Sequence, residues 1–201
     1  MSFSQREREI ERIKAQLRRL HGICDALLAR ALEKKLTVRE AEEAVWLAEH
    51  VRDEIVTSIL LFMARRQPLG KDLIFAKSAL GASYDLYRIV RYVRENALLS
   101  EIAAPGSALI DEGLRSAIFK VSEMLRDAVR GLIDGDVEAA KGVLRMDEEI
   151  DSLYELSLSK LRSSSALTSV ETARLLVLRH IERMADHATY VARTALELHQ
   201  A

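Results

Sequence analysis

The residues with the clearest potential for chemistry lie near the end of the sequence, in the segment IERMADHA at positions 181–188. Glu182 and Asp186 stand four residues apart there, and His187 follows directly. On a helix, residues at this spacing share one face, and two like charges cost roughly 0.2–0.5 kcal/mol. A nearby cation, either an arginine or a metal ion, would offset that repulsion. The spacing therefore indicates an acidic stripe that needs a positive partner.

A second acidic stripe precedes the first one, in the segment MDEEID at positions 146–151. Asp147 and Asp151 are again four residues apart. If the two segments form antiparallel neighbouring helices, the stripes can meet, and converging carboxylates cannot all stay charged without a cation. Oxygen ligands suit Mg²⁺, Ca²⁺, Mn²⁺ or iron, whereas ligation by His180 or His187 would shift the preference towards a transition metal.

The acidic stripes do not by themselves define a metal site or an active site. The carboxylates could be solvated charges that pair with nearby arginines, namely Arg145, Arg179 and Arg183. A ferritin-like di-iron site requires Glu-x-x-His on two helices, and none of the histidines has a glutamate three positions earlier. The sequence also lacks a G-x-S-x-G motif and a glycine-rich phosphate loop, and Cys24 falls on an apolar helical stripe. We therefore expect no enzymatic activity.

The composition favours a helical protein of the cytoplasm. Only two prolines and eight glycines interrupt 201 residues, of which 49% are hydrophobic and 30% charged. Thirty basic and 31 acidic side chains leave no basic excess, so we do not expect a nucleic-acid partner. A single cysteine suits a reducing compartment. The first residues lack a signal-peptide pattern, and the apolar run IVTSILLFMA is too short to span a bilayer.

Apolar residues recur at helical spacing along almost the whole chain and predict six helices. Thr37 with Glu40 and Thr168 with Glu171 form capping boxes that open the second and sixth helices, and Asp136 caps the fifth. The second helix ends at ARRQ before Pro68, the third runs to about Leu99, the fourth to about Leu132 and the fifth to about Arg162. Loops are predicted at SEIAAPGS (100–107) and at serines 163–165.

The two halves of the sequence repeat each other. A shift of 98 positions places LARALEKKLTVREAEEAV (28–45) over RDAVRGLIDGDVEAAKGV (126–143). A shift of 95 places LYRIVRY (86–92) over IERMADH (181–187). We therefore predict an all-α fold of two tandem three-helix bundles, residues 1–102 and 103–201, with a boundary near residues 100–106.

Three segments of this chain resemble motifs of the PhoU family, regulators of phosphate uptake. ARRQP (64–68) looks like the A-x-R-Q-P turn of that family, and IERMADHATYVA (181–192) is similar to its L-E-R-I-x-D-x-A-x-N-I-A helix. MDEEID (146–151) resembles the acidic D-x-x-x-D of the helix before it. The duplicated three-helix layout matches as well, so the resemblance extends over nearly the whole chain.

The resemblance implies a cytoplasmic, dimeric adaptor that restrains phosphate uptake and signalling when phosphate is plentiful. Its implied partners are the ATP-binding subunit of a phosphate ABC transporter, a sensor histidine kinase and a second copy of the chain, so it would meet the membrane only through partners. It also implies a metal ion or multinuclear cluster of iron, zinc, manganese or magnesium. The implied ligands are Asp147, Asp151, Glu182 and Asp186, with His187 as a further candidate.

The first half departs from the family pattern. Glu49 and Asp53 correspond to acidic ligands, but Tyr87 and Arg91 stand where the family has Glu and Asp. We therefore predict a degenerate first site, in which Arg91 holds Glu49 and Asp53 in place of a metal. The alternative for the whole chain is a metal-free helical module that regulates another transporter.

Overall fold

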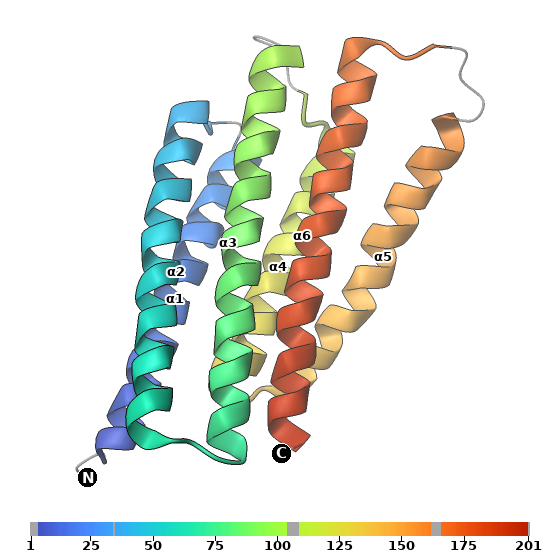
Figure 1. Cartoon of the computed structure of the whole chain (residues 1–201). Coiled ribbons are helices and arrows are strands. Elements are labelled where there is room, and N and C mark those ends of the chain that lie inside the picture. Colours follow the sequence, from blue (N-terminus) through green and yellow to red (C-terminus); the bar gives the residue numbers. More distant parts are fainter. Residues whose placement is uncertain (1–3, 34, 104–108, 162–165, 201) are drawn as a thin grey trace.

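The computed structural model describes residues 4–33, 35–103, 109–161 and 166–200, and all regular secondary structure within these ranges is helical. The all-α prediction is therefore confirmed. The elements, in chain order, are α1 (Gln5–Leu32), α2 (Val38–Arg66), α3 (Lys71–Ala103), α4 (Glu112–Asp134), α5 (Val137–Leu161) and α6 (Ser169–Gln200) (Figure 1). None of these described helices combines the length and apolar character that a membrane span requires.

Side-chain caps fix the starts of several helices, as the sequence predicted. The Thr37 hydroxyl accepts a hydrogen bond from the backbone N–H of Glu40, whose carboxylate accepts one from the N–H of Thr37. Thr168 and Glu171 repeat this arrangement before α6. Asp136 accepts a hydrogen bond from the N–H of Ala139 at the start of α5. These contacts satisfy backbone donors that a helix leaves unpaired in its first turn.

The helix ends differ from the prediction at one place. The third helix was expected to end near Leu99, yet α3 continues to Ala103. The Ser100 hydroxyl donates to the carbonyl oxygen of Asn96, so it bonds to the helix backbone and does not compete with it. The predicted loop is therefore wrong for residues 100–103. The rest of the predicted boundary, and serines 163–165, lie outside the described residues.

The helices form two layers. Contacts between neighbours order one layer as α2, α3, α6 and α5, while α1 and α4 form the other layer behind it (Figure 1). The chain runs up, down and up through the first three helices and then down, up and down through the last three. Each repeat is thus inverted relative to the other. The central pairs, α3 with α6 and α1 with α4, run antiparallel across the junction.

The junction between the repeats belongs to the core. The buried apolar side chains of both halves form a single cluster. The helices α3 and α6 pack against each other, and both contain fully or almost fully buried alanines, such as Ala82, Ala185, Ala188 and Ala192. The structure therefore gives each repeat a large apolar face that only the other repeat covers. The division into units 1–102 and 103–201 stays a prediction.

Candidate metal centre

The predicted acidic residues of the second repeat lie on two helices that pack against each other. Asp147 and Asp151 belong to α5, and Glu182 and Asp186 belong to α6. The Asp186 carboxylate is close enough to Asp147, Asp151 and Glu182 to raise the pKa of each of them. The structure therefore brings the four carboxylates into one electrostatic neighbourhood, as the two stripes predicted.

Asp147 is the least satisfied of these groups. Its Oδ1 atom is buried and lies beyond hydrogen-bonding distance of the described residues, although the Thr189 hydroxyl, which is also buried and unpaired among them, is near enough to lower the pKa of Asp147. Burial raises the pKa of Asp147, and the negative charges of Asp151 and Asp186 raise it further. The pKa of Asp151 is also raised, first by burial and then by Asp186. Both groups carry a cost that a nearby cation would relieve.

The α6 carboxylates already have positive partners. Glu182 forms an ion pair with Arg179 one turn earlier, and Arg183 Nε lies 3.7 Å from its Oε2. Arg183 Nη1 also donates to Asp186 Oδ2 at 2.9 Å. Burial raises the pKa of Glu182 and Asp186 raises it further, while the two arginines act against that rise. These side chains thus offset part of the repulsion that the spacing predicted.

The carboxylates are near each other, but they do not form a coordination shell. Within residues 4–33, 35–103, 109–161 and 166–200, no group of three or more potential ligands is arranged to hold a metal ion. The donor chemistry fits a hard cation, since carboxylate oxygens predominate and one buried oxygen is unpaired among the described residues. Metal binding at Asp147, Asp151, Glu182 and Asp186 stays a prediction.

His187 points to the other repeat. Its Nδ1 lies 2.8 Å from Oδ1 of Asp85 on α3, and both side chains are largely buried. Tyr92 of α3 and Tyr190 of α6 flank the imidazole ring, with ring centroids 5.9 Å away in each case. Sequence reasoning missed Asp85, although a carboxylate on the apolar face of a helix signals a buried partner. One imidazole nitrogen is therefore engaged across the junction, and ligation through His187 stays a prediction.

The first half does not form the predicted ion pair. Glu49 and Asp53 are exposed on α2, and among the described contacts Asp53 pairs with Arg52 of its own helix, at 3.5 Å. Arg91 instead donates to the Tyr87 hydroxyl at 3.4 Å. The buried Tyr87 ring lies under the Arg52 guanidinium of α2, so a cation–π contact links α2 and α3 where Arg91 was expected to contact Glu49 and Asp53.

Comparison with known proteins relates the chain to PhoU proteins. The sequence profile described as "PhoU domain" matches residues 114–195, which include most of α4, α5 and most of α6. A Synechocystis protein named "Phosphate-specific transport system accessory protein PhoU homolog" is 27% identical over 92% of this chain and 87% of its own length. A homolog with the same name from Caulobacter vibrioides is 28% identical over 92% of this chain and 85% of its own.

Residues 114–195 match the PhoU domain, and the chain is similar over most of its length to PhoU homologs of other organisms. Its fold agrees with crystal structures of two PhoU proteins. PhoU from Pseudomonas aeruginosa superposes with a TM-score of 0.83 at 21% identity, over 98% of this chain and 99% of the other. The phosphate transport system regulatory protein PhoU from Streptococcus pneumoniae gives 0.80 at 19% identity, over 96% of each chain. PhoU is a family of regulatory proteins, which confirms the expectation that the chain is not an enzyme.

Proposed function

We propose that this protein is an accessory regulator of a phosphate-specific transport system and restrains uptake by contacting other proteins. The names of relatives that match 92% of the chain support this role. The proposed partners are the ATP-binding subunit of the transporter, a sensor histidine kinase and a second copy of the chain. The protein would work in the cytoplasm and reach the membrane through these partners.

We further propose that Asp147, Asp151, Glu182 and Asp186 bind a metal ion or a small metal cluster. The observation that carries this proposal is the partly buried Asp147 carboxylate, which lies near Asp151 and Asp186 and has only the Thr189 hydroxyl close to its buried Oδ1 atom. A cation there would neutralise neighbouring carboxylates whose pKa values are raised by burial and by each other. Binding would require Glu182 and Asp186 to exchange their arginine partners for the metal. Iron, zinc, manganese and magnesium are the candidate ions.

The metal content of the purified protein tests this part of the proposal. Protein prepared without chelators and without a histidine tag should contain metal, and the double variant Glu182→Ala, Asp186→Ala should lose it while remaining helical. Glu148→Gln is the matched control, because this exposed α5 carboxylate lies between the proposed ligands. If the double variant and the wild type hold equal amounts of metal, the site is elsewhere.

A metal-free helical interaction module is the second candidate, and the arginines favour it. Arg179 and Arg183 already pair with Glu182 and Asp186, so the α6 stripe has positive partners without a metal. In that case the wild type would contain no stoichiometric metal, and adding metal would leave its melting temperature unchanged. Co-purification from native cells tests the partners. Recovery of transporter subunits supports phosphate regulation, and recovery of a different transporter supports the alternative.

A further inference from the structure

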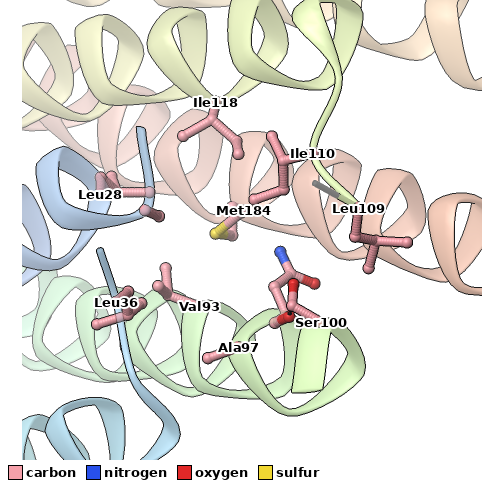
Figure 2. A pocket seen from close by; sticks show the side chains of 11 residues that line it. Leu28, Leu36, Val93, Ala97, Ser100, Leu109, Ile110, Ile118 and Met184 are labelled. Atoms are coloured by element: carbon pink, nitrogen blue, oxygen red, sulfur yellow. Dashed lines mark hydrogen bonds between the residues drawn. The ribbon is translucent and has the colours of Figure 1, made fainter. Parts of the chain in front are cut away.

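An apolar cavity lies where the two repeats meet, away from the carboxylates. It has a volume of about 120 Å³ and is lined by both halves of the chain. Leu28 of α1 and Val93 of α3 form one side, while Ile118 of α4 and Met184 of α6 form the other (Figure 2). These side chains are almost completely buried. Cavities of similar size with apolar walls bind small organic molecules in other proteins.

One residue that lines the cavity, Leu109, is held from outside. Its carbonyl oxygen accepts a hydrogen bond from Arg174 Nε at 3.2 Å. The Asp111 side chain caps α4 just after this residue, by accepting a hydrogen bond from the N–H of Leu114. Arg115 of α4 donates to the carbonyl oxygen of Leu32 at the end of α1. The cavity is therefore framed before any ligand enters it.

One polar group in the cavity wall lacks a partner within the described part of the chain. Asn96 is only 6% exposed and lines the cavity. Its Oδ1 lies 2.8 Å from Nδ1 of His180, and an amide oxygen can only accept a hydrogen bond. The amide nitrogen of Asn96 is therefore the group that remains available, as a donor. No described residue accepts a hydrogen bond from that nitrogen. Ser100, one turn later, also lines the cavity, and its hydroxyl proton is used by the Asn96 carbonyl.

We propose that this cavity is a binding site for a small neutral carboxamide-like ligand with a branched aliphatic body. The ligand carbonyl would accept from the Asn96 amide, and its N–H would donate to the free lone pairs of Ser100. The walls would cover the aliphatic part. None of the described residues that line the cavity is ionisable, so a charged ligand would be buried without a counter-charge. Because both repeats form the walls, such a ligand would tie them together.

Titration of the full chain with isobutyramide, followed by NMR of the methionine and isoleucine methyl groups, tests the proposal. The methyl signals of Met184 and Ile118 should shift and saturate, whereas those of Ile59, which is buried in α2 and does not line the cavity, should stay in place. The hydrocarbon 2,3-dimethylbutane has a similar shape without the amide and serves as the reference probe for purely apolar binding. Absence of a saturable shift with isobutyramide overturns the proposal.

Two variants separate ligand binding from a void that accepts any small apolar molecule. Asn96→Asp keeps an oxygen for His180 but removes the donor, and it should weaken isobutyramide binding about tenfold without changing hydrocarbon binding. Ala97→Leu places a larger side chain in the cavity wall and should abolish binding of both probes. If Asn96→Asp leaves the ratio of the two affinities unchanged, the proposed ligand class is overturned; if that variant fails to fold, Asn96→Leu, which also removes the donor, provides the same comparison.

Discussion

At the scale of single residues, Asp147 tests whether the acidic stripes serve a metal. Without metal, its buried oxygen has only the Thr189 hydroxyl close by, and its charge lies near those of Asp151 and Asp186. Asp147→Asn removes one of these like charges, so the metal-free variant should melt about 2–4 °C above the metal-free wild type, a change of about 1 kcal/mol. Thermal unfolding in the presence of a chelator measures the difference.

Adding metal should reverse the order of these melting temperatures. The wild type should gain stability by ligand linkage, and Asp147→Asn should gain much less because one ligand is lost. Glu148→Gln, which changes an exposed carboxylate of the same helix, should follow the wild type in both conditions. A variant that responds to metal as strongly as the wild type would remove Asp147 from the proposed site.

The Asp85–His187 contact concerns a different kind of residue-scale interaction. Asp85 is 8% exposed, and its removal would leave the buried His187 Nδ1 without its partner. Asp85→Ala should therefore destabilise the fold by about 1–3 kcal/mol. A double-mutant cycle with His187→Ala, measured by urea unfolding, should give a coupling energy of at least about 0.5 kcal/mol. Additive losses would show that the two side chains do not depend on each other.

At the scale of helices, the capping boxes make the clearest prediction. Thr37 supplies the oxygen that accepts the N–H of Glu40 at the start of α2. Thr37→Ala should cost about 1 kcal/mol, and the equivalent change Thr168→Ala before α6 should cost a similar amount. Urea unfolding of both variants checks this expectation. Thr57→Ala on the exposed face of α2 is the control. An equal loss of stability in this variant would show that the caps contribute no more than an ordinary surface threonine.

The same capping box predicts a pH dependence. Hydrogen bonds from the Thr37 backbone, from Arg30 and from the Thr37 hydroxyl lower the pKa of Glu40 from 4.5 to about 2. Because the pKa is lower in the folded protein, the stabilisation is complete above the unfolded value and is lost as the pH falls from 4.5 towards 2. Glu40→Gln should therefore be less stable than the wild type at about pH 7, and the difference in free energy of unfolding should be smaller at about pH 3. Urea unfolding of both proteins at the two pH values measures this difference.

The helices also show how far the sequence alone could lead. Local signals predicted the caps at Thr37, Asp136 and Thr168, because each involves groups within a few positions of each other. The two acidic stripes were also predicted to meet. The contact of His187 with Asp85 could not be predicted, since it depends on the register of α3 against α6, 102 residues apart in sequence. The same holds for Tyr87, whose aromatic ring contacts Arg52 of α2 where an ion pair was expected.

At the scale of the whole molecule, the outer face of α2 favours self-association. Trp46 is 61% exposed and Leu60 is 57% exposed on that helix. Burying such side chains against a second copy would remove apolar surface from water. We expect a dimer in analytical ultracentrifugation and a shift towards monomer for Trp46→Glu. Arg39→Glu, which changes another exposed α2 residue, is the control. A wild type that sediments as a monomer would contradict this prediction.

The inverted packing of the repeats also bears on how such a molecule could arise by duplication. Position 85 of the first repeat corresponds to His180 of the second, and Tyr92 corresponds to His187. In the structure Asp85 contacts His187, and the ring centroids of Tyr92 and His180 lie 5.4 Å apart. Two copies of the first repeat in the same arrangement would set Asp85 against Tyr92, and two copies of the second would set histidine against histidine. Two identical halves would therefore lack the Asp85–His187 bond, so this contact requires that the halves differ and favours their pairing with each other over pairing of either half with a copy of itself.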